Sequence, residues 1–344
     1  MSEIDFVLPW IDGDDPHLQQ LRRQYLTPSL NLQDEAASAR FRDMGTLRYA
    51  LRSITYHCPW YHKIYLIVKS LPPSWIKSDH PRIEIIKESD LFKDKSHLPV
   101  FNPTAVEMNL KNLKGLSETF VYLNDDFFIW RPIPPERFFV DGMPVDFFAH
   151  SPIPRNIFFE LIKKRDTWIY SIVNTLKLLN SHLAPIHMEP RFLYHPTYSF
   201  LDKMNNFLFQ NFFRKVIWIT HWHLPQPLLK KTLLEVNQFF EPYLMETSKH
   251  RFRSKNDLNQ YIYRYWQLLT QQFYPYRHND GYVINIRSYR HLHQAMTHLQ
   301  NNKSLNFVCL NDHPQLSENE YKKTVKTLHD FLKKQFPQKA EFEQ

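Results

Sequence analysis

Glycine and cysteine are scarce in this sequence, and each shortage excludes a class of protein. With 5 glycines among 344 residues, the chain contains neither GxGxxG nor GxxxxGK followed by Ser or Thr, which excludes the glycine-rich phosphate loops of dinucleotide-binding and P-loop enzymes. The 2 cysteines, Cys58 and Cys309, are too few for a disulfide framework or a zinc cluster. This cysteine content fits a reducing compartment.

Long apolar runs are also missing. The first residues, MSEIDFVLPW, lack the basic segment and apolar run of a secretory signal, and no uninterrupted apolar run is long enough to cross a membrane. We therefore expect a cytoplasmic protein. The composition, 43% hydrophobic and 15% aromatic, is that of a globular chain with enough apolar residues for one large domain or two smaller ones.

The charge of the chain is positive. The formal net charge is +8 and the pI is about 9.2. Such a charge suits nucleic acid, an anionic membrane surface or a phosphorylated substrate, and does not choose among them. The basic residues are dispersed and lie among acidic residues that would repel nucleic-acid phosphates, so we expect no nucleic acid partner, although a nucleic-acid-binding protein stays open as an alternative.

Apolar runs that predict strands alternate with helical patterns in the first half of the chain. Strands are expected at 4–10, 63–68, 82–86 and 121–123, and helices at 16–25, 39–54 and 104–113. This alternation predicts an α/β fold with a mostly parallel, Rossmann-like sheet covered by helices.

The chain is expected to form a single catalytic domain, 1–344, made of four parts. These are an α/β half at 1–153, a helical insertion at 154–215, a second catalytic half at 216–316 and a basic C-terminal helix at 317–344. The insertion is predicted from long, aromatic-rich helical segments such as 168–179 and 200–213.

Two predicted strands end in the same pair of residues. Asn124, Asp125 and Asp126 follow an apolar run, and Asn311 with Asp312 follows another. Ligands bind at the carboxyl ends of strands in open α/β sheets, and paired carboxylates suit Mg²⁺ shared with substrate phosphates. An ordinary polar turn is the alternative, because Asn and Asp favour turns.

Polar groups near the first strand and the first long helix also suit a nucleotide. The loop after the first strand carries Asp12 and Asp14, which suit ribose hydroxyls or a metal better than bare phosphate. On the helix, Arg48 and Arg52 are four residues apart and could clamp a diphosphate by bidentate hydrogen bonds. The alternative is a solvated helix face paired with Asp43.

Two histidines stand out among the 18 in the chain. His221 and His223 are two residues apart, which on a strand would place them on one face and suggest a zinc pair. A third ligand at a recognisable spacing is missing. We therefore favour one of the two as a general base, for which the pKa of histidine is well suited.

Taken in order, these clusters resemble the Stealth family of sugar-1-phosphate transferases. The family includes bacterial capsular polysaccharide phosphotransferases and is related to the lysosomal-enzyme N-acetylglucosamine-1-phosphotransferase of animals. Four blocks carry the resemblance: residues 4–15; residues 40–54 with 98–107 and 124–128; residues 223–225 with 247–257; and residues 308–312. The sequence departs from the family at Met44 and Thr46, where Asn and Glu are frequent, and at Pro103-Thr104, where Ser-His is common.

The resemblance implies a GT-A-like, nucleotide-sugar-binding sheet and a reaction. A hexose-1-phosphate, such as N-acetylhexosamine-1-phosphate, would pass from a UDP-sugar to a hydroxyl of a growing capsular or surface polysaccharide, with release of UMP. It implies catalytic roles for His223, Asp125, Arg253 and Asp312, and Mg²⁺ binding, with Mn²⁺ as the alternative ion, by Asp125, Asp126 and Asp312. Substrate contacts are implied for Asp12, Asp14, Arg40, Arg42, Asn102, Asn124, Arg251, Asp257 and Asn311.

Two hypotheses accompany this one. A metal-dependent glycosyltransferase of similar fold would use the same acidic pair but release UDP. Separately, five lysines of the C-terminal segment could bring the protein to the inner face of the cytoplasmic membrane. They are Lys322, Lys323, Lys326, Lys333 and Lys334. A solvated helix face is the alternative for these lysines.

Overall fold

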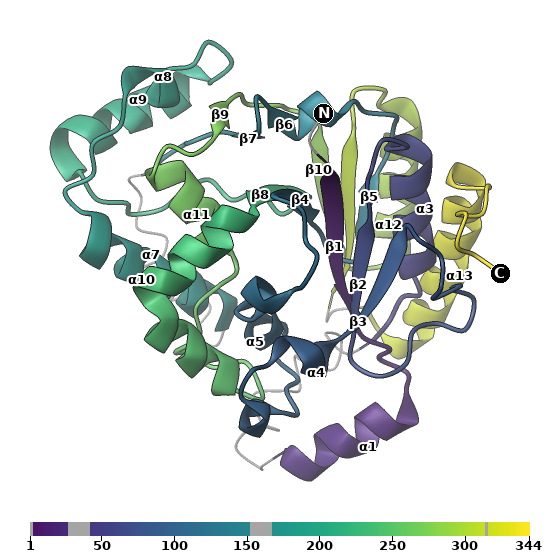
Figure 1. Cartoon of the computed structure of the whole chain (residues 1–344). Helices are drawn as coiled ribbons and strands as arrows, with labels where there is room; N and C mark the ends of the chain where they lie inside the picture. Colours follow the sequence, from purple (N-terminus) through teal and green to yellow (C-terminus); the bar gives the residue numbers. More distant parts are fainter. Residues whose placement is uncertain (1–2, 27–41, 152–166, 314–315) are drawn as a thin grey trace.

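The computed structural model describes residues 3–26, 42–151, 167–313 and 316–344, and its main element is a five-stranded sheet (Figure 1). The strand order is β3-β2-β1-β4-β8, with only the edge strand β8 antiparallel to its neighbour. The bounds are β1 (Ile4–Trp10), β2 (Ile64–Val68), β3 (Ile83–Lys87), β4 (Thr119–Tyr122) and β8 (Gln226–Leu229). The expected α/β fold with a mostly parallel sheet is confirmed.

Both faces of this sheet are buried, which explains the continuous apolar strands in the sequence. All five residues of β2, Ile-Tyr-Leu-Ile-Val, are buried. Tyr65 and Ile67 face one apolar cluster, while Ile64, Leu66 and Val68 face another. Strands covered on both sides need no polar face, and helix α3 (Leu47–His57) supplies part of one cover.

A second sheet continues directly from the first. It has the order β10-β11-β5, with β10 (Gly281–Ile286) parallel to β11 (Phe307–Asp312) and β5 (Phe127–Ile129) antiparallel to β11. Residues 123–126 are all that separates β4 of the first sheet from β5 of the second. The predicted acidic turn is therefore the junction of the two sheets.

Helices cover the second sheet on the right of Figure 1. They are α12 (Tyr289–Asn301) and α13 (Glu318–Gln335). Leu292 and Leu299 of α12 and Leu328 and Leu332 of α13 share one apolar cluster with the β10 and β11 side chains. The predicted C-terminal helix thus packs on the body of the protein.

The left of Figure 1 is mostly helical, as the sequence predicts for 168–179 and 200–213. The helices are α7 (Thr167–Leu183), α8 (Pro190–Leu193), α9 (Phe200–Leu208) with the π-helical turn η5 (Phe209–Phe213), α10 (Lys230–Lys249) and α11 (Tyr261–Leu269). Side chains of α7, α10 and α11 join the same apolar cluster as those of β2 and β4. This part of the chain therefore shares its core with the five-stranded sheet.

The remaining elements are short. They are α1 (Pro16–Tyr25), α4 (Glu88–Leu91), η2 (Lys95–His97), α5 (Pro103–Glu107), η3 (Leu110–Asn112), η4 (Pro135–Arg137), and the small sheet of β6 (Phe139–Val140), β7 (Met143–Asp146) and β9 (Tyr274–Pro275). The helix expected at 104–113 is divided into α5 and η3. Among the described residues, no helix combines the length and the apolar character needed to cross a membrane.

Candidate active site

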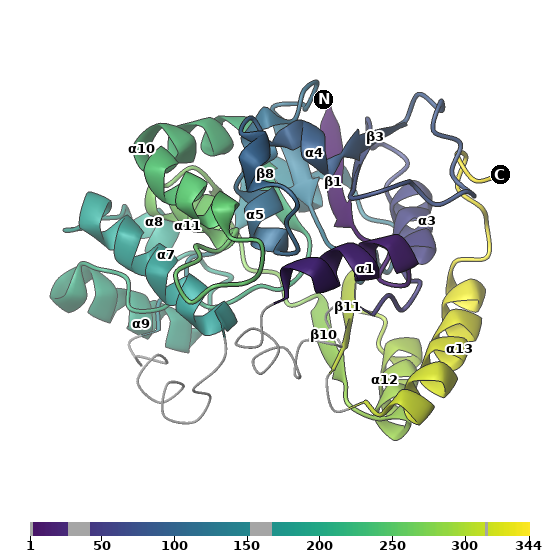
Figure 2. The same ribbon diagram turned by 90° about the horizontal axis from the view of Figure 1, so that it is seen from below.

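The candidate site lies at the carboxyl end of β4. Strand β1, parallel to β4, leads toward α1 at the bottom of Figure 1, so Figure 2 looks onto this end of the sheet. The turn is closed by a hydrogen bond from Phe127 N to Asn124 O, 3.2 Å. Leu310 N of β11 donates to Asp126 O at 3.1 Å and fixes the turn to the second sheet.

The two carboxylates of the turn lie in an environment that disfavours their charge. Burial raises the pKa of Asp125 well above its usual range, and the nearby charges of Asp126 and Asp43 raise it further. Burial also raises the pKa of Asp126, against the opposing effect of His223. Asp126 Oδ1 is buried and has no hydrogen-bond partner among the described residues. A cation bound at this turn would stabilise the negative charge of the two carboxylates and would give Asp126 Oδ1 a partner.

His223 lies beside this pair. Its ring meets the edge of Phe127 at a centroid distance of 5.0 Å. Burial lowers the pKa of His223, while the charge of Asp126 and a hydrogen bond with Asn311 act in the opposite direction. The net effect is a lowered pKa, so the imidazole is neutral near pH 7 and can accept a proton.

The hydrogen bonds of His223 select one tautomer. Its Nδ1 lies 3.3 Å from the hydroxyl of Tyr261, and that hydroxyl donates to the backbone oxygen of Trp222 at 3.2 Å. Because the hydroxyl has a single hydrogen, Nδ1 of His223 is the donor to Tyr261. In the neutral ring Nε2 is then the basic nitrogen, and the protonated ring gains a second N–H that can donate to Asn311, which is why this bond favours the charged form.

Residues 221–225 do not form a strand, so strand geometry does not place the two histidines on one face. The rings of His221 and His223 are nevertheless stacked, with centroids 5.8 Å apart. No group of three or more His, Cys, Asp or Glu side chains among the described residues is arranged to hold a metal ion by itself. Mg²⁺ commonly uses one or two carboxylates plus substrate phosphates, and Asp125 with Asp126 fits that pattern.

Glu107, at the end of α5, is a site residue that our sequence reasoning missed. The hydroxyl of Tyr122 donates to Glu107 Oε1 at 2.7 Å, and that of Tyr263 donates to the Glu107 backbone oxygen at 3.0 Å. Burial raises the pKa of Glu107 to about 7, with Tyr122 and Arg253 opposing. The signal was present: Glu107 is the one charged residue in the otherwise uncharged segment 103–110.

Arg253 links Glu107 to the histidine. Its positive charge lowers the pKa values of both Glu107 and His223. It belongs to the segment after α10, which is held by Asp257. The carboxylate of Asp257 contacts His250 Nδ1 at 2.6 Å and accepts from Ser254 N at 2.8 Å.

Asn102 and Asp257 contact each other, although the sequence assigns both to substrate binding. Asn102 Nδ2 donates to Asp257 Oδ2 at 2.9 Å, and both residues are buried. This bond fastens the 250–257 segment to the start of α5. Asn102 and Asp257 thus help to position Glu107, which lies in α5, and Arg253, which lies in the 250–257 segment. Arg251, in the same segment, lies over the ring of Tyr25 at 4.9 Å.

Asp312 and Arg42 form an ion pair across the chain. Arg42 Nε donates to Asp312 Oδ2 at 2.8 Å and Arg42 Nη2 donates to Oδ1 at 2.9 Å. The Asp312 carboxylate, predicted as a metal ligand, is thus occupied by a cation from the protein itself. Its neighbour Asn311 points to His223, as their hydrogen bond indicates. Arg40 lies outside the described residues.

The loop after β1 acts on the site through Asp43. Asp43 accepts from Gly45 N at 2.6 Å and from Trp10 Nε1 at 3.1 Å. Burial raises the pKa of Asp43, and the charges of Asp12 and Asp14 add to this effect. Asp43 in turn raises the pKa of Asp125. Asp12 and Asp14 of the loop, Asp43, and Asp125 of the turn therefore belong to one electrostatic group.

The diphosphate clamp predicted at Arg48 and Arg52 is wrong. Arg52 donates to both carboxylate oxygens of Glu343, at 2.6 and 2.8 Å, and to Phe336 O at 3.0 Å. Arg48 Nε lies 3.8 Å from the same carboxylate. Glu343 is 291 positions beyond Arg52, a separation at which local sequence patterns carry no signal.

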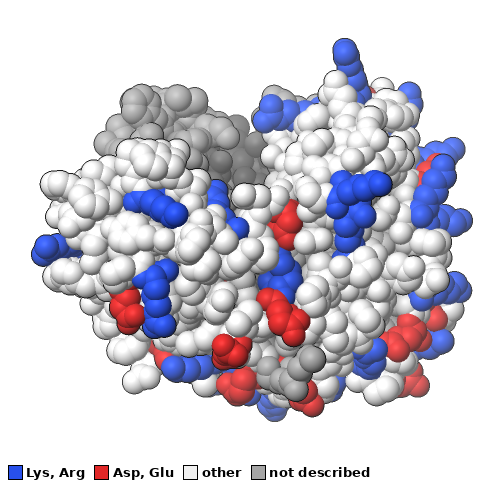
Figure 3. Space-filling model, turned by 90° about the horizontal axis from the view of Figure 1, so that it is seen from above, with Lys and Arg blue, Asp and Glu red and all other residues white. Residues whose placement is uncertain are grey.

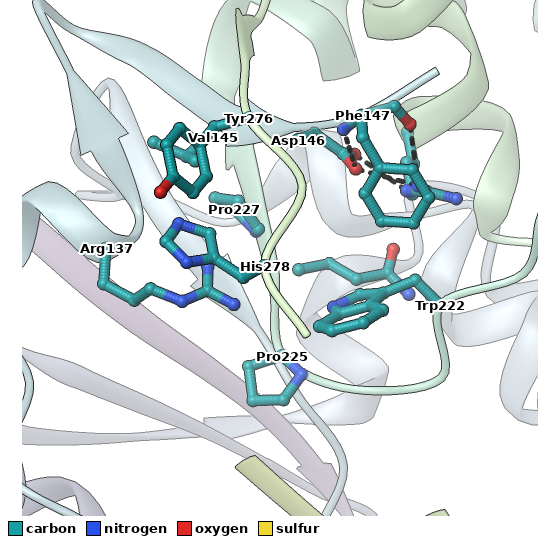
Figure 4. A pocket seen from close by; sticks show the side chains of 11 residues that line it. Arg137, Val145, Asp146, Phe147, Trp222, Pro225, Pro227, Tyr276 and His278 are labelled. Carbon is teal, nitrogen blue, oxygen red and sulfur yellow. Dashed lines mark hydrogen bonds and ion pairs between the residues drawn. The ribbon is translucent and has the colours of Figure 1, made fainter. Parts of the chain in front are cut away.

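A separate pocket adjoins Trp222, the residue before His223 (Figure 4). Arg264 and Asp146 on its wall form a buried ion pair with N–O distances of 2.7 and 2.8 Å. Phe147 meets Trp222 edge to face at 5.9 Å. The pocket includes none of the predicted catalytic residues. Its wall packs against Trp222, however, and so helps to position the neighbouring His223.

Three family models match the chain in order. They describe conserved regions 2, 3 and 4 of Stealth proteins and match residues 40–147, 222–265 and 297–344. The chain is 31% identical over 343 residues to the exopolysaccharide phosphotransferase cps2G of Lactiplantibacillus plantarum, covering 99% of this chain and 96% of that protein. The chain belongs to the Stealth family.

Other relatives have similar names. The capsular polysaccharide phosphotransferase WcwK of Streptococcus pneumoniae is 30% identical over 350 residues, covering 100% of this chain and 99% of that protein. Among solved structures, the galactosyltransferase LgtC with donor and acceptor sugar analogues aligns over 96% of this chain and 95% of its own, at 9% identity and a TM-score of 0.36. We draw no conclusion from a structural similarity this weak.

Proposed function

We propose that this Stealth protein transfers a hexose-1-phosphate from a UDP-sugar to a hydroxyl of a capsular or surface polysaccharide and releases UMP. The observation that carries the proposal is the position of a neutral His223 beside Asp126, within the electrostatic reach of Arg253. The relatives named as exopolysaccharide and capsular polysaccharide phosphotransferases support the reaction class.

In the proposed reaction the acceptor oxygen attacks the phosphorus that bears the sugar. The bond from that phosphorus to the bridging oxygen breaks, and UMP leaves with this oxygen. His223 Nε2 takes the acceptor proton, and Tyr261 keeps the ring in the required tautomer. Arg253 offsets the negative charge that develops around the phosphorus.

Asp125 and Asp126 are the residues that would hold Mg²⁺ or Mn²⁺. Their buried, mutually repelling carboxylates and the orphaned Asp126 Oδ1 fit such an ion. When bound, the ion would supply charge neutralisation for the diphosphate. Asn124 would be a neutral oxygen ligand or a substrate contact, and Asp12 and Asp14 would contact hydroxyls of the nucleoside or sugar.

Glu107 has a role in this proposal that depends on its proton. With a pKa of about 7 it is partly protonated at neutral pH, and its partner Tyr122 is influenced by the charge of Asp125. We propose that Glu107 adjusts its charge when the anionic donor binds beside Arg253. This keeps the net charge of the buried site close to neutral.

The test is to identify the nucleotide that is released. Purified protein is incubated with Mg²⁺, a panel of UDP-hexoses and oligosaccharide acceptors, and the products are separated by chromatography. We expect UMP that depends on both acceptor and metal, and a loss of at least 100-fold in kcat for His223→Ala and for Asp126→Asn. Release of UDP would contradict the proposal and identify a glycosyltransferase instead.

A matched control distinguishes chemistry from folding. His293→Ala changes an exposed histidine of α12, a helix that carries none of the candidate site residues. It should keep activity within a few-fold of the wild type. Equal losses in His293→Ala and His223→Ala would show that the assay reports instability. The cytoplasmic location stays a prediction.

A further inference from the structure

Helix α9 has its polar and apolar residues on unexpected sides. The residues it buries include Asp202 and Asn206. The residues it exposes include Phe200, with 83% of its surface accessible, and Phe207, with 51%. A helix of a globular protein normally shows the opposite pattern, with its apolar stripe facing the core.

The orientation of α9 is fixed by hydrogen bonds. Asn206 accepts from His150 N at 2.9 Å and donates to Phe148 O at 2.8 Å and to Leu193 O at 2.9 Å. Asp202 forms a capping box with Ser199 and an ion pair with Arg277. If α9 rotated, the buried side chains of Asn206 and Asp202 would lose these partners, at the cost of unsatisfied polar groups. The hydrogen bonds therefore keep the apolar side of α9 facing outward.

The apolar surface continues beyond α9 into η5. Phe212 is 70% accessible, and Leu201, Met204 and Phe213 are also exposed. We call these four residues, with Phe200 and Phe207, the α9 face. Contiguous exposed apolar surfaces mark sites that bind a partner or a membrane, whereas single exposed apolar residues do not.

The charges next to the α9 face are positive. Arg214 and Lys215 follow η5 directly and are exposed, and Lys203 is partly exposed. The one acidic residue in 200–215, Asp202, is buried and paired with Arg277. In Figure 3 the left side of the molecule, where α8 and α9 lie in Figure 1, is mostly uncharged, with scattered Lys and Arg and little red.

We propose that the α9 face docks on an anionic membrane surface. Exposed Phe, Leu and Met side chains beside Arg and Lys are the composition of helices that lie in the bilayer interface, where apolar side chains enter the acyl boundary and bases meet acidic headgroups. A second copy of the chain is a poorer partner, because two copies would bring the same cationic groups together.

This assignment replaces the C-terminal helix as the membrane contact. The five lysines of α13 are exposed, but its apolar residues Leu328, Phe331 and Leu332 are buried against the protein. Helix α13 therefore offers charge without an apolar face. Figures 1 and 2 both place α9 and α13 at opposite sides of the molecule, so one flat membrane would not contact both.

The experiment measures co-sedimentation of the full chain with vesicles. The anionic vesicles contain phosphatidylcholine with about 30% phosphatidylglycerol, and the neutral vesicles contain phosphatidylcholine alone. We expect binding to the anionic vesicles, weaker binding to the neutral ones, and at least a tenfold loss of affinity in the triple variant Phe200→Ser, Phe207→Ser, Phe212→Ser. Arg214→Glu with Lys215→Glu should lower binding to the anionic vesicles only.

The control removes exposed apolar side chains elsewhere. Leu234 and Tyr243 of α10 are 53% and 56% accessible, and the variant Leu234→Ser, Tyr243→Ser should bind vesicles as the wild type does. Equal binding by the wild type and the α9-face variant would overturn the proposal. So would a dimer, seen by sedimentation velocity, that the α9-face variant converts to a monomer. Neither outcome depends on which nucleotide the enzyme releases.

Discussion

At the scale of single residues, the candidate site is a set of groups whose pKa values are shifted away from their ordinary values. His223 holds its proton less tightly than usual, and Glu107 and Asp125 hold theirs more tightly, in each case chiefly because of burial. Such opposed shifts in one place are typical of sites for proton transfer and phosphate chemistry. Two predictions follow from the direction of the shifts.

The first prediction concerns the pH dependence of activity. A general base is needed in its neutral form, and the pKa of His223 is below the ordinary 6.5, so kcat/KM should stay level down to below pH 6.5 and then fall. The Asn311 hydrogen bond favours the charged imidazole, so Asn311→Ala should move this fall to a still lower pH. Asn301→Ala, on the exposed end of α12, is the control. An acid limb above pH 6.5 that persists in Glu107→Gln would remove His223 as the base.

The second prediction concerns stability and Glu107. The folded protein keeps this proton up to about pH 7, while an ordinary Glu releases it near 4.5, so the wild type loses stability as pH rises between these values. The difference corresponds to about 3 kcal/mol. Glu107→Gln has no carboxyl group to titrate and so lacks this loss of stability. The free energy of unfolding of Glu107→Gln, measured with urea and taken relative to the wild type, should therefore rise by about 3 kcal/mol from pH 4.5 to 8. Parallel pH profiles for the two proteins would contradict the shift.

At the scale of elements, the start of β10 supports the segment that carries His223. Gly281 leaves space for Leu224 and Trp222, and an added Cβ would overlap Leu224 Cδ1 and lie 3.0 Å from Trp222 Cη2. Leu224 is buried, so a shift of its side chain would press on the packed residues around it. Gly281 is therefore required by a close approach between two elements.

Gly281→Ala should for this reason reduce kcat through a displaced His223. We expect a tenfold or larger fall in kcat, a smaller change in KM, and a destabilisation of about 1–3 kcal/mol from overpacking. Steady-state kinetics and urea unfolding measure these effects. A variant that is less stable but turns over normally would show that this contact supports the fold alone. Gly142→Ala is a control, because the added Cβ there would meet nothing within 4 Å and its cost in stability would come from the left-handed φ of +73° in the turn between β6 and β7.

Element types were predicted well, and side-chain partners were not. The strands at β1, β2 and β11 are apolar runs whose burial on both faces explains their composition, so the sequence alone identifies them. The ion pair between Arg42 and Asp312 joins residues 270 positions apart. Arginine at 42 is equally compatible with a substrate phosphate, and only the fold, which brings residue 42 beside the end of β11, decides its partner.

At the scale of the whole molecule, the candidate site lies where two sheets and the helical half meet. Asp125 and Asp126 come from the link between the sheets, His223 from the segment before β8, and Glu107 from α5. None of these parts contains the complete group. The α9 face lies on the helical side, so docking there would leave the link between the sheets uncovered.

The pairing of Arg52 with Glu343 has a consequence for biosynthesis. Arg52 belongs to the helix that covers the first sheet and is 7% accessible, but its carboxylate partner emerges from the ribosome 291 residues later. At 5–20 residues per second this is a delay of roughly 15–60 s. During that interval a nascent chain would have to keep α3 hydrated or shielded by a chaperone, and the ion pair that anchors α3 would form only after Glu343 has emerged.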